Sequence, residues 1–458
     1  MKKAIKKLVP KFVLDYYYAL WPFLGAFVYG HPSRKLKLIG ITGTNGKTTV
    51  THITSHMLEQ AGFKVASVSS LRFKIGLNEW QNRLKMTMPG RMKLQKFMKD
   101  AVKAGCEYAV IEVTSEGIKQ SRHMFLKFDT VAFTNLTPEH IESHGSFEKY
   151  REVKGALFGL PHRTSVVNLD DENSEYFLNF QAKEKIGYTL SPKKAENFKF
   201  QISNPAYRLA SLPRRSGQAG FKTNSNDQNS KLQTVLGENA NTSPKGINFK
   251  IEGREFELPL LGEFNIYNAL TAVSIGVAQG LSLEKAQQAL YSFKGVAGRL
   301  EIVIKEPFTV VVDYAHTPDA LEKAYKAVQD LKPITYNLKP KMICVLGSAG
   351  GGRDKWKRPE LGKIASQYCD EIILTDEDPY DEDPEDILKS VATGLSTGTS
   401  YKKIINRRNA IAEALKKAQK NDIVLITGKG AEPLMVTAKG PIDWDDREIV
   451  KEEYNKLG

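Results

Sequence analysis

GITGTNGKTT, residues 40–49, is the stretch that decides the fold of this chain, a glycine-rich turn that ends in Gly46-Lys47-Thr48. Apolar residues 36–41 predict a strand before the turn, and residues 49–60 predict a helix after it. In such a loop backbone N–H groups converge on phosphate oxygens, the lysine adds a positive charge, and the threonine hydroxyl can ligate Mg2+. The turn therefore predicts a phosphate-binding site.

The glycine spacing of this loop departs from the common phosphate-loop pattern. That pattern places its first glycine five residues before the second, and Ile41 occupies the position here. Gly40, Gly43 and Gly46 instead recur at every third residue, so a plain strand-to-helix turn is the alternative interpretation. The loop residues that we expect to bind a nucleotide are Gly43, Thr44, Asn45, Gly46, Lys47, Thr48 and Thr49.

Length and composition indicate a multidomain globular protein. The 458 residues are about three times the usual domain length of roughly 150. Charged residues at 26% and hydrophobic residues at 41% exclude a disordered chain and a membrane bundle. The three cysteines, Cys106, Cys344 and Cys369, form no CxxC pair and no zinc spacing. We therefore expect a reducing cytoplasmic setting without structural disulfides.

The N-terminal segment is basic and aromatic. Residues 1–37 hold eight Lys or Arg against Asp15 alone, which is half of the chain's net charge of +14. The apolar residues 12–30, interrupted by Asp15 and Pro22, are marginal as a spanning helix. They suit a helix that packs on the protein or a partner, or one that lies on a membrane surface. No cleavage site predicts a secretory signal, and no recognition motif predicts nucleic-acid binding.

Hydrophobic periodicity divides the rest of the chain into two α/β blocks. In the first, strands at 108–113 and 130–134 alternate with helices, which is typical of a parallel sheet. Polar residues 203–246 predict a long mobile or partly disordered insertion. Further ordered segments are expected at 249–261, 265–280 and 282–293, and strands of the second block at 308–313, 342–346, 371–375 and 422–427.

The fold class expected is therefore α/β, with a central phosphate-loop ATPase-like domain that has a mostly parallel sheet and a Rossmann-like α/β C-terminal domain. The predicted divisions are an N-terminal segment 1–35, a central domain 36–300 and a C-terminal domain 301–458. Ligands of such sheets gather beyond the carboxyl ends of the strands.

Polar side chains at two predicted strand ends suggest a metal site. Glu112 ends the second strand and could hold a metal against bound phosphates, or cap the next helix. His140 and His144 follow the third strand in TNLTPEHIESHG. The segment has no HExxH core, so contact with Mg2+ or phosphate is favoured over zinc, and helix capping or solvent exposure is the alternative.

The chain resembles the Mur ligase family, and most of all its MurE members, which add the third amino acid to the peptidoglycan stem peptide. The resemblance begins near residue 36 and rests on nine ordered segments: GTNGKTT, EVTS, TNLTPEHIESHG, YREVKGALF, LLGEFNIYNAL, GVAGRLE, DYAHTPDAL, GSAGGGRDKWKRP and GKGAE. The family's version of the phosphate loop has the glycine spacing seen here.

The resemblance implies roles for matching residues. Lys47 and Thr48 would bind ATP phosphates and Mg2+, and Lys154 matches a lysine that is carbamylated in these ligases, although its sequence alone suggests a surface helix lysine. Asn268, Arg299 and Asp313 would contact ATP. The implied catalytic residues are Lys47, Glu112, Lys154 and His144, the implied metal ligands are Thr48, Glu112, His144 and Lys154, and the implied substrate contacts are Thr87, Ser115, Arg353, Lys357, Asp378 and Glu432.

Three departures from the family pattern bear on the substrate. About 35 residues precede the nucleotide strand, where MurE proteins carry a UDP-binding domain. The diaminopimelate-selecting DNPR motif aligns with residues 377–380, EDPY, which lacks the arginine. Nearby acids would favour a basic amino acid such as lysine, or form a solvated turn. Glu116 and Ala431 replace two family histidines.

The implied activity is an ATP-dependent, ADP-forming amide ligation through an acyl phosphate, assembled when the C-terminal domain closes over ATP. ATP and Mg2+ are the expected cofactors, and the expected partners are an amino acid and a carboxylate-bearing peptide or cell-wall precursor. A cytoplasmic location is expected, with contact at the inner membrane face through residues 1–37 left open. The alternatives are a ligase like cyanophycin or folylpolyglutamate synthetase, and a non-catalytic scaffold recruited to a membrane.

Overall fold

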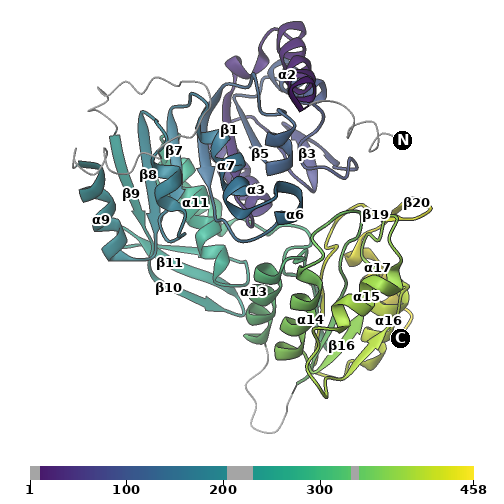
Figure 1. The fold of residues 1–458 in the computed structure, drawn as a ribbon. Helices are drawn as coiled ribbons and strands as arrows, with labels where there is room; N and C mark the ends of the chain where they lie inside the picture. The colour runs from purple at the N-terminus through teal and green to yellow at the C-terminus, as the bar shows by residue number, and fades with distance from the viewer. Residues whose placement is uncertain (1–10, 204–230, 332–339, 458) are drawn as a thin grey trace.

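The computed structural model describes residues 11–203, 231–331 and 340–457 as two α/β domains (Figure 1). We take residues 36–300 as the central domain and 301–458 as the C-terminal domain, because the second large sheet begins with β13 (Glu301–Ile304). The expected α/β class is confirmed, with parallel strands predominating in both large sheets.

The central sheet has nine strands in the order β4-β3-β2-β5-β1-β6-β7-β8-β9. All neighbouring pairs from β2 to β9 are parallel, whereas β3 and β4 add antiparallel pairs at one edge. The strands are β1 (Lys37–Thr42), β2 (Val65–Val68), β3 (Arg72–Ile75), β4 (Asn78–Gln81), β5 (Tyr108–Glu112), β6 (Phe128–Phe133), β7 (Thr164–Asn168), β8 (Glu184–Thr189) and β9 (Lys231–Leu236).

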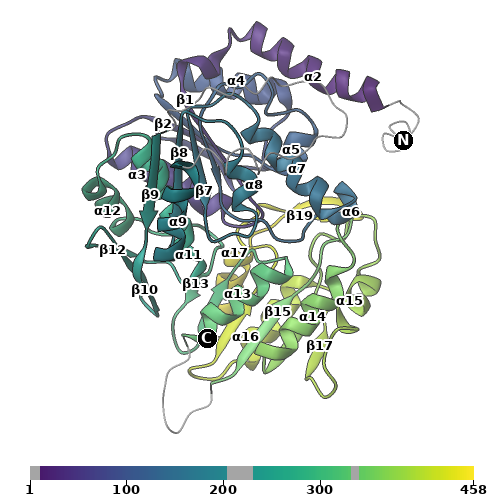
Figure 2. The same ribbon diagram turned by 60° about the vertical axis from the view of Figure 1, so that its left-hand side comes forward.

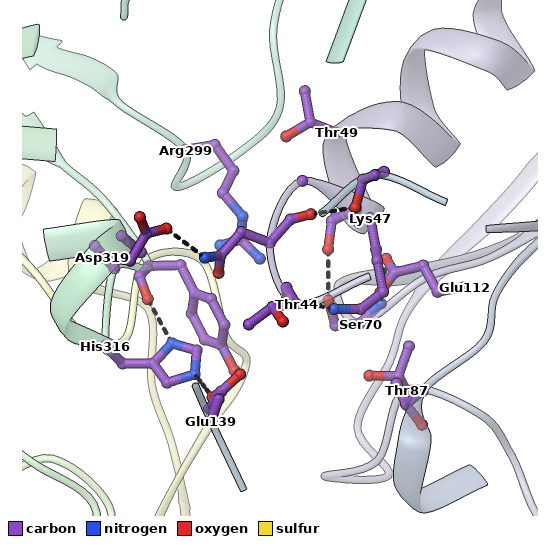
Figure 3. A pocket seen from close by; sticks show the side chains of 18 of the residues that line it. Thr44, Lys47, Thr49, Ser70, Thr87, Glu112, Glu139, Arg299, His316 and Asp319 are labelled. Carbon is purple, nitrogen blue, oxygen red and sulfur yellow. Dashed lines mark hydrogen bonds and ion pairs between the residues drawn. The ribbon is translucent and has the colours of Figure 1, made fainter. Parts of the chain in front are cut away.

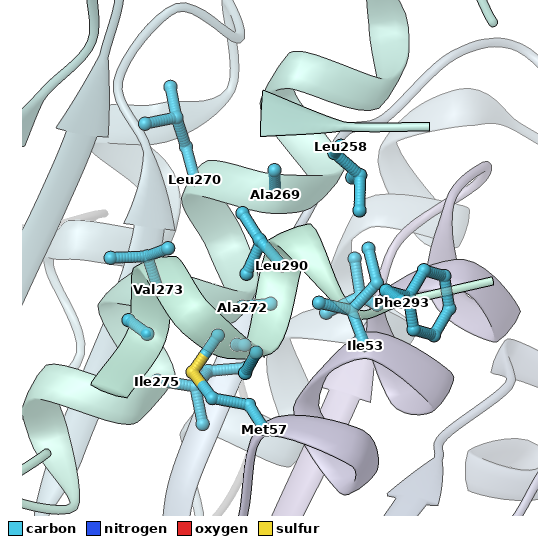
Figure 4. Packing of buried hydrophobic residues seen from close by; sticks show 14 of the residues in the cluster. Ile53, Met57, Leu258, Ala269, Leu270, Ala272, Val273, Ile275, Leu290 and Phe293 are labelled. Atoms are coloured by element: carbon cyan, nitrogen blue, oxygen red, sulfur yellow. The ribbon is translucent and has the colours of Figure 1, made fainter. Parts of the chain in front are cut away.

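Helices cover both faces of this sheet. One face packs on α3 (Lys47–Gln60), α11 (Phe264–Ala278) and α12 (Leu283–Tyr291), where Figure 4 shows Ile53 and Met57 beside Ala272 and Ile275. The other face packs on α4 (Arg91–Lys103), α5 (Ser115–Lys119), α7 (Phe147–Phe158) and α8 (Ser174–Leu178). Buried apolar residues on both faces hold β1 rigidly, so the loop that follows it is firmly placed. The central domain also contains α6 (Ile141–His144) and α9 (Pro192–Ser203), and η1 (Pro32–Lys35) precedes it.

Part of the polar insertion is ordered, so the expectation of a mobile stretch over 203–246 is wrong for its second part. Residues 231–236 form β9 at the edge of the central sheet, and β10 (Glu238–Ser243) begins a three-stranded antiparallel sheet with β11 (Gly246–Ile251) and β12 (Arg254–Leu258). Pairing with β8 and β11 stabilises these polar strands, which their composition alone does not indicate. Residues 204–230 lie outside the described residues.

The C-terminal sheet has six strands in the order β13-β14-β18-β15-β16-β17, and only the β13–β14 pair is antiparallel. Helices α13 to α15 cover one face, and α16 and α17 cover the other. The elements are β14 (Thr309–Val312), α13 (Pro318–Gln329), β15 (Met342–Leu346), α14 (Lys357–Tyr368), β16 (Glu371–Leu374), α15 (Pro384–Ala392), β17 (Tyr401–Lys403), α16 (Arg407–Lys417), β18 (Ile423–Ile426), β19 (Leu434–Thr437), β20 (Gly440–Asp443) and α17 (Asp446–Tyr454).

A disulfide links Cys344 and Cys369, whose Cα atoms are 6.0 Å apart, so the expectation of no structural disulfide is wrong. Cys344 lies on β15, and Cys369 ends α14 just before the neighbouring strand β16. The two residues are 25 positions apart, and only the strand order brings them together. Cys106 is a buried free thiol.

The apolar N-terminal stretch forms α2 (Lys11–Val28), which packs along α4. Among the described residues, no helix has the length and apolar character needed to cross a membrane. In both views α2 lies at the upper end of the central domain, and the C-terminal domain lies at the lower end (Figures 1 and 2).

Candidate active site

The phosphate loop joins β1 to α3 and requires glycine at two positions. Gly43 has φ 150° and Gly46 has φ 84°, both in the region that favours glycine. A Cβ at Gly43 would lie 1.9 Å from Thr134 Oγ1, and one at Gly46 would lie 2.2 Å from Asn268 Oδ1. The backbone therefore approaches two other segments too closely for a side chain, and α3 begins with its N–H groups directed at the loop.

Two lysines meet at this loop, the half-buried Lys47 and the buried Lys154. Lys47 Nζ donates to Gly43 O at 2.9 Å and to Thr44 O at 2.7 Å, and Lys154 Nζ donates to Gly43 O at 2.7 Å. Burial lowers the pKa of both lysines, and the charge of Lys47 lowers that of Lys154 further. Lys154 is 1% exposed, so its interpretation as a surface helix lysine is wrong.

Glu112 lies beside the loop at the carboxyl end of β5. Its Oε1 accepts from Ser70 N at 3.1 Å, and the Ser70 hydroxyl lies 2.8 Å from Thr48 Oγ1. Burial raises the pKa of Glu112, while the positive charge of Lys47 opposes that shift. Thr114, not Glu112, caps α5 by accepting from Gly117 N, so the capping alternative for Glu112 is wrong.

In the segment after β6, Glu139 and His140 face the interdomain cavity, whereas His144 does not. Glu139 and His140 line the cavity described below, with His140 Nε2 3.7 Å from Glu139 Oε1. His144 lies behind this wall, where its Nε2 is 3.3 Å from Ser115 Oγ, and burial lowers its pKa to about 4. No three His, Cys, Asp or Glu side chains in the described ranges converge on a common metal position.

A cavity of about 550 Å³ lies between the two domains. Figure 3 shows Lys47, Glu112 and Ser70 on one side of it and His316 and Asp319 on the other. Gly43, His144 and Lys154 lie behind its wall. The expected site residues that line it are Thr44, Asn45, Gly46, Lys47, Thr48, Thr49, Thr87, Glu112, Ser115, Asn268, Arg299, Asp313, Arg353, Lys357, Asp378 and Glu432.

Hydrogen bonds across the cavity hold the domains in contact. Asn45 Nδ2 of the phosphate loop donates to Asp319 Oδ2 at 2.9 Å. The Asp354 carboxylate accepts from the N–H groups of Ile141 and Glu142, at 3.2 and 3.1 Å, and so caps the first turn of α6 from the other domain. Both contacts depend on loops at the carboxyl ends of strands.

Asp313 and Arg299 lie where the chain passes from one domain to the other. The two oxygens of Asp313 accept from Leu300 N and Ala315 N, each at 2.7 Å. Arg299 stacks its guanidinium 4.1 Å from the centre of the Tyr314 ring. Asp313 thus fixes the domain connection while it lines the cavity.

Two lysines and two carboxylates form an ion network at the far wall, here called the amine-side network: Lys85, Asp378, Lys429 and Glu432. Lys429 Nζ donates to both oxygens of Asp378 at 3.0 and 2.9 Å and to Glu432 at 2.5 Å. Lys85, from the central domain, donates to each carboxylate at 2.9 Å. Although burial opposes the shift, Lys429 and Lys85 lower the pKa of Glu432 to about 2.

Only part of the acidic stretch after β16 faces the cavity. Glu377 and Asp378 line it, whereas Glu382 pairs with Arg358 and Asp383 caps α15. Glu377 is buried, and its Oε2 has no hydrogen-bond partner in the described part of the chain. The acids of this stretch therefore divide between the cavity and contacts elsewhere in the C-terminal domain.

Sequence reasoning assigned no role to several residues that build the site. Ser70 contacts Glu112 and Thr48, Asp319 binds the phosphate loop, and Lys85 and Lys429 pair with Asp378 and Glu432. Lys429 lies in the GKGAE segment and could have been found there. Lys85 belongs to no motif, so only the fold reveals its contact.

The chain matches two family models, the Mur ligase middle domain over residues 41–276 and the Mur ligase glutamate ligase domain over residues 298–430. It is 34% identical to the UDP-N-acetylmuramyl-tripeptide synthetase of Roseiflexus sp., over 96% of this chain and 82% of that one. It is 35% identical to UDP-N-acetylmuramoyl-L-alanyl-D-glutamate--2,6-diaminopimelate ligase 1 of Clostridium acetobutylicum, over 95% and 81% of the two chains.

Solved structures agree with this assignment. A UDP-N-acetylmuramoyl-L-alanyl-D-glutamate--2,6-diaminopimelate ligase is similar with a TM-score of 0.55 and 26% identity, over 92% of this chain and 79% of that one. The folylpolyglutamate synthase of Mycobacterium tuberculosis has a TM-score of 0.63 over 90% and 92% of the two chains, but at 16% identity it shows the fold alone. The expected resemblance is confirmed, and the chain belongs to the Mur ligase family of ATP-dependent, amide-bond-forming enzymes, with MurE-like relatives.

Proposed function

We propose that this protein joins an amino acid to a carboxylate of a UDP-muramyl peptide precursor of peptidoglycan and forms ADP. The observation that carries the proposal is one cavity between the domains, lined by the phosphate loop with Lys47 on one side and by the acids Glu377, Asp378 and Glu432 on the other. Its sequence relatives carry the names of enzymes for such precursors. An anionic nucleotide and a cationic amine can therefore be held on opposite sides of a reacting carboxylate.

The phosphate loop suits ATP, and the residues beside it suit Mg2+. Mg2+ usually binds one or two protein carboxylates together with substrate phosphates and waters, so a larger protein cluster is not required. Glu112 is a buried carboxylate whose neighbours include the Thr48 hydroxyl, and together they would hold the ion. When bound, Mg2+ would neutralise charge on the phosphate oxygens.

In the proposed reaction, a carboxylate oxygen of the acceptor attacks the γ-phosphorus of ATP, and ADP leaves. The amine of the incoming amino acid attacks the resulting acyl phosphate at its carbonyl carbon and loses a proton. The C–O bond then breaks, and phosphate leaves with that electron pair. Lys47, Arg299 and Lys357 line the cavity and would neutralise the anions that must approach one another.

A carbamate on Lys154 is part of the proposal. An amine reacts with CO2 only in its neutral form, and burial favours that form at Lys154. The product would be an anionic carboxylate at the floor of the phosphate loop, beside Lys47. The resemblance implies that His144 is a metal ligand, but its side chain lies behind the cavity wall, so we propose that it supports the site without lining the cavity.

Glu377 favours an incoming amino acid with a basic side chain, such as lysine. Tyr380 stands where the family arginine would bind a distal carboxylate. Glu377 lines the cavity with a carboxylate oxygen that has no hydrogen-bond partner within the described ranges, and an ammonium group would satisfy it. Asp378 and Glu432 are already paired with lysines, so Glu377 is the acid available to the substrate.

We place the activity in the cytoplasm, where ATP and nucleotide-linked precursors occur. The cysteines do not support this location, because Cys344 and Cys369 form a disulfide. The placement therefore depends on the substrates alone.

Phosphate release tests the proposed function. The protein would be supplied with ATP and Mg2+, and candidate amino acids would be screened with UDP-linked and UDP-free muramyl peptides. We expect release only when ATP, acceptor and amine are all present, with lysine preferred over diaminopimelate. ATP binding without release under any combination, or no ATP binding, would contradict the proposal.

A further inference from the structure

The outward side of α2 carries a continuous apolar surface, here called the outer stripe: Val13, Tyr16, Tyr17, Leu20, Trp21, Leu24, Phe27 and Val28. These positions recur at intervals of three and four residues, so they share one face of the helix. Tyr16 is 73% exposed, Phe27 is 71% exposed and Val28 is 63% exposed, while Leu20 and Leu24 are half-buried. The sequence has no charged residue from 16 to 28.

The opposite side of α2 is fixed on the protein. Pro22, Gly25 and Ala26 are buried, and a Cβ at Gly25 would lie 3.1 Å from Gln95 Cγ of α4. The guanidinium of Arg91 lies 4.3 Å from the centre of the Tyr18 ring. The helix therefore already has a packed face, and the outer stripe is a second apolar face that solvent covers.

The outer stripe continues onto a neighbouring loop. Phe23 is exposed and meets the exposed Phe125 edge to face, with ring centres 5.4 Å apart. Contiguous exposed aromatic surface of this kind is uncommon on a protein that stays free in water, and it indicates a docking face.

The sequence on both sides of α2, and the helix on which α2 packs, contain many basic residues. Lys2, Lys3, Lys6 and Lys7 precede α2 in the sequence, and the exposed residues Arg34 and Lys35 follow it. Helix α4, on which α2 packs, adds the exposed residues Lys93, Lys96 and Lys103. A second copy of the chain would bring the same positive charges together, whereas an anionic lipid surface would neutralise them.

We propose that the outer stripe docks the protein on the surface of an anionic lipid bilayer, with α2 lying in the plane of the headgroups. Its 18 residues give a helix of about 27 Å, long enough for aromatic rings to enter the interface along its length. Tyrosine and tryptophan suit this position because their rings are apolar and their polar atoms can stay hydrated.

The placement of α2 is compatible with turnover on the membrane. The helix and the C-terminal domain lie at opposite ends of the central domain in both ribbon views (Figures 1 and 2). Docking through the outer stripe leaves the C-terminal domain away from the lipid and free to open and close over the cavity.

Vesicle flotation of the full chain tests the proposal. We expect binding to vesicles of phosphatidylglycerol and phosphatidylethanolamine, and little binding to phosphatidylcholine vesicles. The combined variant Tyr16→Ser, Trp21→Ser, Phe27→Ser should partition at least about tenfold more weakly into the anionic vesicles. The matched control is Tyr291→Ser, Tyr401→Ser, Ile405→Ser, which removes three exposed apolar side chains elsewhere and should float like the wild type.

Replacing Lys2, Lys3, Lys6 and Lys7 by Gln should weaken binding to anionic vesicles and flatten its dependence on salt. Thermal unfolding and ATP binding of each variant show whether it is folded. If the triple variant is unfolded, the single variant Phe27→Ser replaces it in the flotation test. Wild-type protein that stays unbound, or an outer-stripe variant that floats fully, overturns the proposal. Dimers in light scattering that dissociate in the outer-stripe variant, without vesicle binding, overturn it in favour of a second copy.

Discussion

Two pairs of lysines lie near the cavity, one at the phosphate loop and one in the amine-side network, and the two pairs have different hydrogen-bond partners. At the phosphate loop, Lys47 and Lys154 donate to main-chain carbonyls, and both have lowered pKa values. In the amine-side network, Lys429 and Lys85 donate to Asp378 and Glu432, and these acids raise the pKa of Lys429 although burial opposes the shift.

These partners determine which lysine pair can accept an anion. Main-chain carbonyls carry only partial charge, so Lys47 keeps charge that a phosphate can neutralise. The amine-side network is internally neutral, with two lysines for two carboxylates, and it links the two domains through Lys85. We therefore expect the lysine of the phosphate loop to bind an anionic ligand, and the lysines of the amine-side network to stabilise the fold.

The largest expected effect comes from Lys47→Met, which removes the cation of the phosphate loop. We expect kcat/KM for ATP to fall by about 1000-fold with little change in unfolding temperature, because no acid of the described residues forms an ion pair with this lysine. Steady-state ADP formation measures the effect, and the exposed Lys420→Met is the control. A loss of less than tenfold would show that the loop does not need this charge.

Lys154→Ala should lower kcat by about 100-fold if a carbamate supplies negative charge beneath the loop. Bicarbonate or formate should restore part of the activity by filling the space left by the side chain, and chloride should not. The exposed Lys149→Ala on the same helix is the control. The carbamate would be contradicted if Lys154→Ala is as active as the wild type and the wild type keeps its activity after dissolved CO2 is removed.

Lys429→Met should lower the free energy of unfolding more than it lowers the turnover rate. It leaves Asp378 and Glu432 largely buried with Lys85 as their remaining lysine, which should cost about 3 kcal/mol of the free energy of unfolding. Urea denaturation measures this cost, and Lys439→Met is the exposed control. If the two variants unfold alike, the amine-side network does not stabilise the domain.

Lys85→Met removes one of the two lysines that pair with Asp378 and Glu432, and Lys429 remains as their partner. Lys85 competes with an incoming ammonium group for Asp378 and Glu432, so KM for a basic amino acid should fall by roughly tenfold. Arg83→Met, which removes an exposed ion pair with Asp443, should leave KM unchanged. A higher KM would mean that Lys85 helps to hold the substrate.

The pairing of Glu432 also predicts a pH dependence of stability. Glu432 has a pKa of about 2 in the folded protein and about 4.5 as a free side chain. A lowered carboxyl pKa stabilises the folded state fully above pH 4.5, and this stabilisation is lost as the pH falls towards 2. Unfolding free energies measured across this window should fall more steeply for the wild type than for Glu432→Gln, and parallel curves would contradict the pairing.

Local sequence predicted the parts of the site that one loop can build. The glycines before Lys47 and the acid at the end of β5 follow from strand-to-helix patterning, and the structure brings them together at the cavity. The contact between Lys85 and Asp378 spans 293 positions, and the disulfide depends on the order of β15 and β16. Such contacts require the strand order and domain packing, which no local pattern contains.

Burial is the second quantity that the sequence leaves undetermined. Lys154 reads as a surface residue because its helix carries polar neighbours, yet the face that holds it packs against the phosphate loop. Polar residues 231–243 read as an unstructured insertion, yet they pair with neighbouring strands. In both cases tertiary contacts override composition.

Isotope transfer tests the central claim, that the cavity joins a carboxylate to an amine through an acyl phosphate. The acceptor carboxylate would be labelled with 18O, and the phosphate released during turnover would be analysed by mass spectrometry. The mechanism predicts one 18O atom in each released phosphate, because the carboxylate oxygen that attacks ATP leaves with phosphorus. Product formation with unlabelled phosphate would contradict the mechanism.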